Sequence, residues 1–386
     1  MKYEDILKKK AKEWGCKNLM NSVYEVVGER IPFSSPLMNW FTYGGIPRNR
    51  LIEIYGDFGS GKTTTSLDLC KNAYQLFEQE YNAKIENLQE ALAKGDCVEG
   101  ELEELKELGP KKVLYVDIEH SFDIRWAETL GVDLERIDVM QPPDVIAEDL
   151  LQTIRELVES GQVGMVVLDS IPALIPKTVL EKKVGERTVA ALAGLMTNFD
   201  TLIIPLLARY KCTLITINQI RDNLDNPYIV NTPGGKANKF YSSLRLQLRK
   251  GKPVDFLGNE LPKNTENPAG CMIHAMLTKQ KTAPNDRTMG TYYLMFQSGI
   301  RPDFDYASLA INKYHLIKKS AAWYSFIDPN TGEVIINPDT GKPMSVNGMN
   351  RVYDYFNANP GYYEKLKKYI LDDINGKRDE DDTESD

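Results

Sequence analysis

The chain has 386 residues, of which 42% are hydrophobic and 26% charged, an ordinary composition for a globular protein long enough to bury a large core. Apolar runs are shorter than the roughly 20 residues of a membrane span, and the N-terminus is too polar for a secretory signal, so we expect a cytoplasmic protein. Five scattered cysteines and three histidines argue against a disulfide framework or a zinc site, and the net charge of -8 is too unevenly spread to exclude nucleic acid as a partner.

The N-terminal part predicts small elements that cannot form a core of their own. Residues 3 to 14 have the pattern of a short amphipathic helix, and residues 23 to 27 that of a strand. We therefore expect residues 1 to 36 to form a helix and strand element that serves oligomerisation. Residues 37 to 41 predict a short helix, and a Gly-Gly-Ile-Pro turn leads from it toward the first strand of the core.

The stretch from Gly56 to Thr63 has the glycine, glycine-lysine and hydroxyl spacing of a phosphate-binding loop. It follows an apolar run at residues 51 to 55 and precedes a helical pattern, which is the strand, turn and helix order that such a loop requires. Glycines allow the backbone N–H groups to surround a triphosphate, and the helix start adds a positive dipole end. We predict that Lys62 reaches the β and γ phosphates of ATP and that Thr63 holds Mg²⁺; a glycine-rich surface turn is the alternative.

Residues 77 to 110 interrupt the alternation of strands and helices with a charged segment. Its leucines and isoleucine recur at three- and four-residue spacing on either side of a break at residues 94 to 100. This pattern predicts a helical hairpin inserted between the first helix and the second strand. We interpret it as a solvated decoration rather than an active element.

The alternation then resumes and predicts an α/β core. Apolar strands are expected at residues 113 to 117, 137 to 140, 164 to 169 and 213 to 217, with helices at 125 to 130, 146 to 159 and 189 to 210. Such strands, separated by helices, predict a parallel sheet covered on both faces. Period-two patterns at residues 244 to 249, 272 to 277 and 290 to 296 predict added antiparallel strands. The expected division is a core at 37 to 308, a small α+β domain at 309 to 378 and an acidic, disordered tail at 379 to 386.

Acidic and amide side chains follow three of these strands, at the carboxyl ends where such sheets bind ligands. Asp169 is placed to hold a water on Mg²⁺, with a helix cap as the alternative. Asp117 and Glu119 follow the neighbouring strand, and Glu119 is the better candidate for the general base that activates an attacking water, against an ordinary loop acid. Gln219 lies two residues past a strand and is placed to hydrogen-bond the γ-phosphate, although spacing alone is a weak signal.

Six segments resemble bacterial RecA recombinases, and they occur in the same order. They are Ile46-Pro47 with Leu51–Gly56, Asp117–His120, Leu168–Lys177, Ile217–Arg221, Gly234–Tyr241 and Ala322–Ser325. The resemblance runs from about residue 37 to 325 and more faintly to the C-terminus. It implies a RecA-like P-loop ATPase core, and an ATP-dependent recombinase that forms a filament on single-stranded DNA and pairs it with homologous duplex DNA.

The resemblance also implies roles for individual residues. Glu119 matches the catalytic glutamate, Gln219 the γ-phosphate sensor and Phe240 an aromatic at the subunit interface. Lys279 and Lys281 match a lysine pair that reaches the ATP of the neighbouring subunit, where their spacing alone would indicate only a solvated strand face. Trp126 matches the aromatic that stacks on adenine, against the plain core role of most tryptophans. The expected ATP site comprises Gly56, Asp57, Phe58, Gly59, Ser60, Gly61, Lys62, Thr63, Thr64, Asp123 and Trp126, with Mg²⁺ at Thr63 and Asp169.

The loops after Lys177 and after Gln219 match the DNA-binding loops of the family. Their cations can bind the phosphates of single-stranded DNA, and their glycines allow the DNA to approach the main chain closely. Arg249 and Lys250 fit a second site that holds duplex DNA, but His274 and Met276 replace basic residues there, and the helix after the first loop lacks the family's arginines. Single-strand binding is therefore expected more firmly than strand exchange. The predicted DNA contacts are Lys182, Lys183, Arg187, Arg221, Gly234, Gly235, Arg249 and Lys250.

Two other classes of protein share parts of this pattern. A hexameric replicative helicase or a helicase loader has the same loop and sheet but closes as a ring, and a mediator protein binds ATP and DNA without hydrolysis. Glu119 argues against the mediator. The glycine pair Gly234-Gly235 and the segment Ile217–Arg221 favour a recombinase over both.

Overall fold

The structure is a computed structural model that describes residues 29–96, 98–143, 146–182, 190–221 and 231–376, and every structural statement below concerns these residues. The predicted N-terminal helix and strand and the acidic tail lie outside the described residues. The described chain begins with a two-stranded antiparallel sheet of β1 (Arg30–Ile31) and β2 (Ile46–Pro47), with the helix α2 (Pro36–Thr42) between them.

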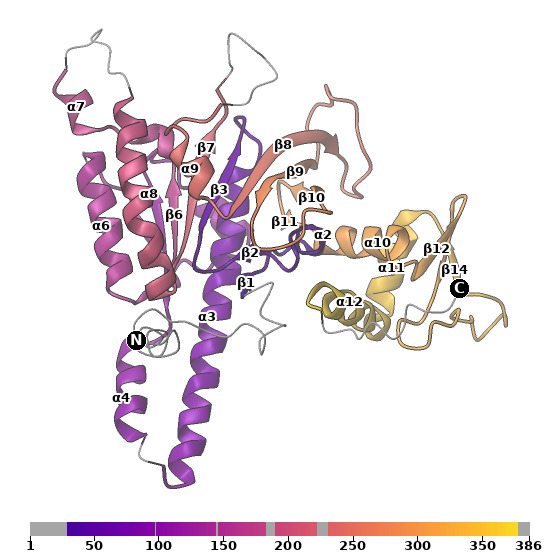
Figure 1. The fold of residues 1–386 in the computed structure, drawn as a ribbon. Coiled ribbons are helices and arrows are strands. Elements are labelled where there is room, and N and C mark those ends of the chain that lie inside the picture. Colours follow the sequence, from indigo (N-terminus) through magenta and orange to yellow (C-terminus); the bar gives the residue numbers. More distant parts are fainter. Residues whose placement is uncertain (1–28, 97, 144–145, 183–189, 222–230, 377–386) are drawn as a thin grey trace, which may run out of the picture.

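A nine-stranded sheet in the order β11-β10-β9-β8-β3-β7-β6-β4-β5 is the scaffold of the molecule (Figure 1). Its parallel part consists of β3 (Leu51–Gly56), β4 (Lys112–Asp117), β5 (Ile137–Met140), β6 (Val163–Asp169), β7 (Thr213–Gln219) and β8 (Leu244–Val254). The antiparallel strands β9 (Gly270–Gln280), β10 (Met289–Met295) and β11 (Gly299–Ile300) extend it beyond β8. The predicted mostly parallel sheet with added antiparallel strands is confirmed.

Helices cover both faces of the parallel part. All residues of β3 and of β6 are buried, which explains why these strands are mostly apolar and lack an alternation of apolar and polar residues; Glu53 in β3 and Asp169 at the end of β6 are the buried acids among them. On one face α3 (Lys62–Ala93) packs through Leu67 and Cys70, and on the other face α6 (Ala147–Glu159) and α8 (Ala191–Tyr210) pack through residues such as Ile154 and Ile203. The carboxyl ends of β3, β4, β6 and β7 therefore meet at one edge of the sheet.

The helix α8 is, within the described ranges, the single helix long and apolar enough to cross a membrane by length and composition. Met196, Phe199, Ile203 and Leu207 of this helix belong to the core beneath the sheet. Packing on one side therefore accounts for part of its apolar character, while Leu202 of the same helix is exposed.

The predicted hairpin at residues 77 to 110 differs from expectation in its first arm. The helix that starts at the phosphate loop continues without a break for 32 residues as α3, and α4 (Glu99–Leu108) runs back beside it (Figure 1). No glycine or proline occurs between Lys62 and Ala93, so the sequence carries no stop signal for the helix. The first arm is thus the extension of α3, not a separate helix.

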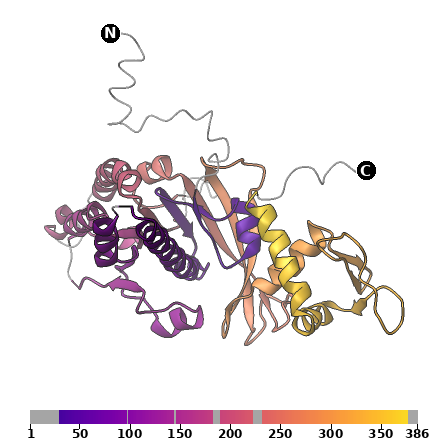
Figure 2. The ribbon, with the colours of Figure 1, turned by 90° about the horizontal axis from the view of Figure 1, so that it is seen from below.

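A second, smaller core lies in the C-terminal part. It is built from α10 (Pro302–Asn312), β12 (Ile317–Ser320), β13 (Trp323–Phe326), β14 (Ser345–Asn347), α11 (Met349–Ala358) and α12 (Pro360–Ile374). The rings of Phe326 and Tyr355 stack in it with centroids 3.8 Å apart. This part and the α3–α4 hairpin lie to either side of the antiparallel strands (Figure 2).

Candidate nucleotide-binding site

The loop from Gly56 to Thr63 connects the carboxyl end of β3 to the start of α3. Gly61 precedes the first helical residue with φ of +85°, a backbone conformation that favours glycine. A Cβ atom on Gly56 would lie 2.2 Å from the carbonyl oxygen of Leu248 and 2.6 Å from Oγ of Ser60. The local geometry therefore requires glycine at both positions, and a helix start of this kind is suited to bind an anion with its first N–H groups.

A cavity of about 550 Å³ lies over this loop, at the carboxyl edge of the sheet. Of the residues predicted for the ATP site, Phe58 to Thr64 and Trp126 line it, together with Glu119, Asp169 and Gln219 from the strand ends. The size lies within the range of small-molecule and cofactor pockets. Residues that the sequence did not indicate, Phe296 and Leu294, add an apolar wall from the antiparallel strands.

Thr63 and Asp169 lie side by side, as the sequence predicted for a magnesium site. Oγ1 of Thr63 donates to Oδ2 of Asp169 at 3.1 Å, and the hydroxyl of Tyr115 donates to the same oxygen at 2.6 Å. Burial raises the pKa of Asp169 to about 6, although both hydrogen bonds oppose this rise. A hydroxyl and a carboxylate are ligands that Mg²⁺ prefers, so these residues fit the ion.

The described residues include no group of three or more His, Cys, Asp or Glu side chains placed to hold a metal by themselves. An ion at Thr63 and Asp169 would therefore take its remaining ligands from phosphate oxygens and water, which is how Mg²⁺ is commonly bound beside a nucleotide.

Lys62 closes the phosphate loop onto itself. Its Nζ donates to the carbonyl oxygen of Asp57 at 2.7 Å. Burial lowers the pKa of Lys62, and the carboxylates of Asp169, Glu119 and Asp57 oppose this shift. A partly buried ammonium held among carboxylates at the cavity is placed to bind phosphate oxygens.

The two acids after β4 have different surroundings. Oδ1 of Asp117 accepts from the backbone N–H of Ser121, and its Oδ2 accepts from Gln141 at 2.8 Å, so Asp117 organises the turn after β4. Glu119 instead lines the cavity, where its Oε1 accepts from the hydroxyl of Ser170 and from Nε2 of Gln219 at 3.3 Å. This geometry favours Glu119 over Asp117 as the general base.

Trp126 and Asp123 belong to the short helix α5 (Ile124–Thr129). Trp126 lines the cavity, and its indole N–H donates to Oγ1 of Thr64 at 3.0 Å while part of the ring packs on the core. The side chain of Asp123 accepts from the backbone N–H of Trp126 at 3.1 Å and caps the helix. Asp123 does not line the cavity. Through this cap it positions the helix that carries Trp126.

Comparisons with known proteins identify the family. The RecA N-terminal domain family matches residues 103–301. The chain is 31% identical to Protein RecA of Clostridium acetobutylicum over 294 residues, which is 75% of this chain and 71% of that protein. It is 29% identical to Protein RecA of Thermus aquaticus over 332 residues, covering 85% and 80% of the two chains. The chain belongs to the RecA family.

The matched range begins inside α4, so the phosphate loop precedes it. The family model therefore does not itself cover this loop. The curated relatives named Protein RecA extend the similarity over most of the chain, for example 86% of it for Mycoplasma mycoides.

The lysine pair expected to act on a neighbouring subunit lies outside the cavity of its own chain. Nζ of Lys279 donates to the carbonyl oxygens of Lys239 and Phe240, both at 2.6 Å, and Nζ of Lys281 donates to that of Phe240 at 3.0 Å. These carbonyls end the helix α9 (Ala237–Tyr241). Burial and the charge of Lys281 lower the pKa of Lys279 to about 8.

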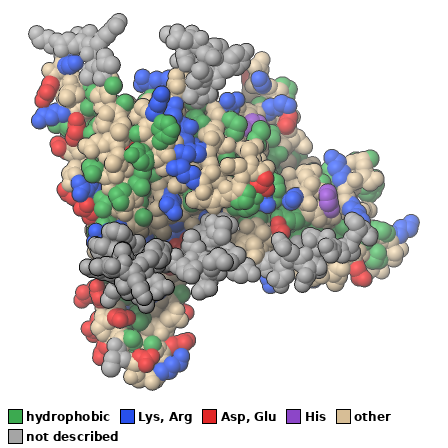
Figure 3. Space-filling view, in the orientation of Figure 1, with side chains coloured by type: hydrophobic (Ala, Val, Ile, Leu, Met, Phe, Trp, Pro, Cys, Tyr) green, Lys and Arg blue, Asp and Glu red, His purple; other side chains and the backbone are tan. Residues whose placement is uncertain are grey.

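Phe240 is 68% exposed beside this lysine pair. The three side chains form one surface patch, and Figure 3 shows a band of Lys and Arg side chains over the region of α9 and β8.

The predicted single-strand contacts are only partly described. Lys182 is exposed just after α7 (Lys177–Leu180), whereas Lys183 and Arg187 lie outside the described residues. The exposed Arg221 donates its backbone N–H to the carbonyl oxygen of Asn231 at 2.9 Å and closes the base of the second loop.

Gly234 and Gly235 end the second loop with φ of +86° and +79°. A Cβ atom on Gly235 would lie 2.8 Å from Cβ of Ala193, and one on Gly234 would lie 3.1 Å from the side chain of Ile171. Packing within the chain is thus a reason for these glycines, besides the predicted approach to DNA.

The two cations assigned to a duplex site lie next to each other on β8, and both are exposed. Lys250 lines the nucleotide cavity, which the sequence did not indicate. Arg249 pairs in register with His274 of β9, whose Nδ1 contacts Oγ1 of Thr291 at 3.0 Å.

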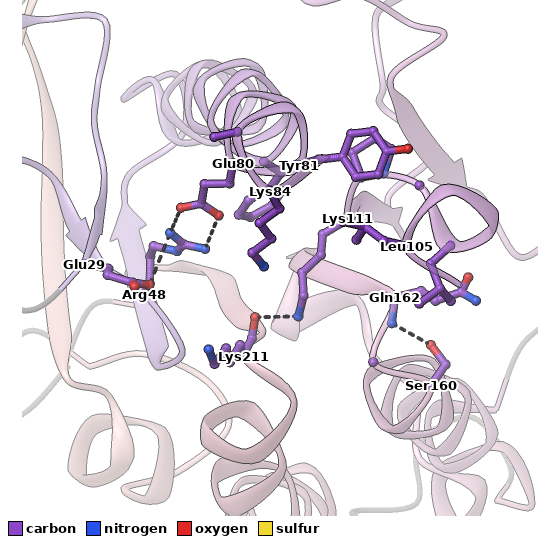
Figure 4. A pocket seen from close by; sticks show the side chains of 16 residues that line it. Glu29, Arg48, Glu80, Tyr81, Lys84, Leu105, Lys111, Ser160, Gln162 and Lys211 are labelled. Atoms are coloured by element: carbon purple, nitrogen blue, oxygen red, sulfur yellow. Dashed lines mark hydrogen bonds and ion pairs between the residues drawn. The ribbon is translucent and has the colours of Figure 1, made fainter. Parts of the chain in front are cut away.

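A larger cavity of about 650 Å³ lies between the α3–α4 hairpin and the core (Figure 4). Its lining includes Arg48, Lys111, Gln162 and Lys211, each of which precedes a strand of the parallel part. This cavity therefore lies at the amino edge of the sheet, opposite to the edge where such sheets bind ligands. Arg48 is paired with Glu80, and Nζ of Lys111 donates to the carbonyl oxygen of Lys211 (Figure 4). The same Nζ also donates to the carbonyl oxygen of Tyr210.

Proposed function

We propose that this protein is an ATP-dependent DNA recombinase that assembles as a helical filament on single-stranded DNA and pairs it with homologous duplex DNA in recombination and repair. The observation that carries the proposal is the position of Gln219 at the end of β7. Its side chain contacts Glu119 at the nucleotide cavity, and its main chain begins the loop predicted to hold single-stranded DNA. One residue thus belongs to both sites. We expect the protein to act in the cytoplasm.

The proposed reaction is hydrolysis of ATP to ADP and phosphate. Lys62 binds the β and γ phosphates, and Glu119 orients the attacking water and accepts its proton. Mg²⁺, held by Thr63 and Asp169, supplies charge stabilisation at the phosphate oxygens when it is bound. Ser170 donates to Glu119 and keeps its carboxylate turned toward the cavity.

The proposed assembly places the Lys279 and Lys281 patch of one subunit on the nucleotide of the next. Two features support it: neither lysine lines the cavity of its own chain, and Phe240, whose carbonyl oxygen accepts from both lysines, has an exposed side chain. Cations from a neighbour complete the charge stabilisation in the manner of an arginine finger. Hydrolysis would then depend on assembly.

Electron microscopy tests this proposal against a ring-forming helicase. The full chain is mixed with single-stranded DNA and a slowly hydrolysed ATP analogue. We expect helical filaments with the analogue and none with Lys62→Ala, which loses the phosphate contact. Closed hexameric rings would contradict the recombinase, as would the absence of joint molecules when homologous duplex DNA is added to filaments.

A further inference from the structure

A buried asparagine joins the two ends of the second DNA-binding loop. Asn218 lies on β7 with no exposed surface. Its Oδ1 accepts from the backbone N–H of Gln219 at 3.0 Å, and its Nδ2 donates to the carbonyl oxygen of Pro233 at 3.0 Å. Gln219 stands at the start of the loop and Pro233 at its end. One side chain therefore fixes both.

The same asparagine is anchored to a buried acid on the neighbouring strand. Nδ2 of Asn218 also donates to Oε1 of Glu53 at 2.9 Å, and Glu53 on β3 has no exposed surface. Both N–H groups of the amide and its oxygen are thus satisfied by three different partners. Only an amide side chain supplies two donors and an acceptor in this geometry, because a carboxylate cannot donate and an alkyl group can do neither.

Glu53 is held in turn by an arginine. Its Oε2 is ion-paired with Nε of Arg245 on β8, and the guanidinium of Arg245 lies over the ring of Tyr55 at 4.6 Å from the centroid. Arg245 pairs in register with Lys279. A buried carboxylate with a hydrogen bond on one oxygen and an ion pair on the other has a fixed orientation.

These contacts form a continuous chain from the nucleotide cavity into the sheet. Glu119 accepts from Gln219, Gln219 is bound through its N–H to Asn218, and Asn218 is bound to Glu53. Neither Asn218 nor Glu53 lines the cavity. Any effect of theirs on the nucleotide is therefore exerted through Gln219 and through the ends of the loop.

We infer that Asn218 and Glu53 are positioning residues that couple the nucleotide state sensed by Gln219 to the loop for single-stranded DNA. This rests on the proposed function, because it takes the loop between Gln219 and Gly234 as the DNA site. With both ends of the loop attached to one side chain, a movement of Gln219 toward or away from Glu119 is transmitted to Pro233. Without that attachment, the two ends move independently.

The experiment measures coupling in the full chain. The dissociation constant of a fluorescent single-stranded oligonucleotide is determined with a slowly hydrolysed ATP analogue and with ADP, and the ratio of the two values is the coupling factor. Asn218→Asp keeps the size but removes both donors and places a second carboxylate beside Glu53. We expect the coupling factor to fall by about 10-fold, within the usual range of coupling between sites, with the affinity for the analogue itself unchanged.

A matched control separates positioning from stability. Thr216→Val, on the same strand, removes a buried hydroxyl that contacts the carbonyl oxygen of Ile52 at 3.2 Å and the amide of Asn238 at 3.1 Å. It should lower the melting temperature yet keep the coupling factor. If Asn218 acts through Gln219, the substitution at Asn218 should have no further effect in a Gln219→Ala background, whereas a purely structural role would be additive.

Glu53→Gln provides a second route should the Asn218 variants fail to fold, and the same loss of coupling is expected from it. A folded Asn218→Asp or Glu53→Gln with the wild-type coupling factor would overturn the inference, as would an equal loss in Thr216→Val. If the wild-type protein binds single-stranded DNA with neither nucleotide, the proposed DNA function itself fails, whereas equal binding with both nucleotides would overturn the inference alone; both outcomes are seen before any variant is made.

Discussion

Oε1 of Glu119 accepts a hydrogen bond of 3.3 Å from Nε2 of Gln219, although the two residues are 100 positions apart in the chain. The contact exists because β4 and β7 flank β6 in the sheet, so their carboxyl ends lie at the same edge. It places a candidate general base and a candidate phosphate sensor at the same cavity.

The first prediction concerns the general base. Glu119→Gln keeps the size of the side chain and its contact with Ser170 but cannot accept a proton. ATP turnover should fall by roughly 100-fold or more, the scale of a lost general base, while binding of ATP and DNA persists. Phosphate release at saturating ATP and single-stranded DNA measures this. Glu107→Gln on the exposed hairpin is the control, and retained turnover would remove Glu119 from the role.

The second prediction concerns the shared site. Alanine at both Lys279 and Lys281 should abolish DNA-stimulated hydrolysis, because the cations act on the nucleotide of a neighbour. Mixing this variant with Glu119→Gln should recover some turnover, since some mixed interfaces combine an intact lysine pair with an intact base. Turnover is measured across mixing ratios. Because the lysines also bind the carbonyl groups that end α9, circular dichroism must first show an unchanged fold; no recovery at any ratio would contradict a shared site.

The third prediction concerns the DNA loop. Arg221→Ala should weaken single-strand binding for all sequences alike, because a phosphate contact carries no base information. The slope of log affinity against log salt should become shallower by about 1. Titrations of two unrelated oligonucleotides at several salt concentrations measure both quantities. Lys263→Ala, an exposed cation in a different loop, is the control, and an unchanged slope would show that Arg221 does not contact the strand.

The fourth prediction concerns a buried acid outside the site. Asp200 on α8 has no exposed surface, and neither of its carboxylate oxygens has a hydrogen-bond partner. Burial, with a smaller contribution from Glu53, raises its pKa from the ordinary value of 3.8 to about 7. The folded state therefore holds the proton more tightly than the unfolded state. The resulting stabilisation is complete below about pH 4 and is lost as the pH rises toward 7.

Asp200→Asn removes this dependence because the amide stays neutral. The melting temperature of the variant should exceed that of the wild-type protein at pH 8, and the difference should shrink as the pH is lowered toward 4. Thermal unfolding at a series of pH values measures it. Asp138→Asn, an exposed acid on β5, is the control. Parallel curves for the Asp200 variant and the wild-type protein would contradict the assignment.

Local constraints were sufficient to predict much of this protein from its sequence. The phosphate loop is recognisable because glycine is required where a Cβ atom would collide with neighbouring backbone, as at Gly56. The parallel strands are recognisable because a strand covered on both faces is apolar at most positions on both of its sides, as β3 and β6 are apart from Glu53 and Asp169. The proximity of Thr63 and Asp169 followed from the rule that ligands bind at the carboxyl edge of a parallel sheet. In the structure Oγ1 of Thr63 lies 3.1 Å from Oδ2 of Asp169.

Tertiary structure alone decided which side chains meet across that edge. The roles of Ser170 beside Glu119 and of Tyr115 beside Asp169 had no signal in the sequence, and Asn218 was visible only as the neighbour of Gln219. The contacts of Tyr115 with Asp169 and of Asn218 with Glu53 join residues of different strands, and that of Ser170 with Glu119 joins residues that follow two different strands. Their partners depend on the order β3, β7, β6, β4 in the sheet. Backbone propensity and hydrophobic periodicity act over a few residues along the chain, whereas strand order results from packing the whole core.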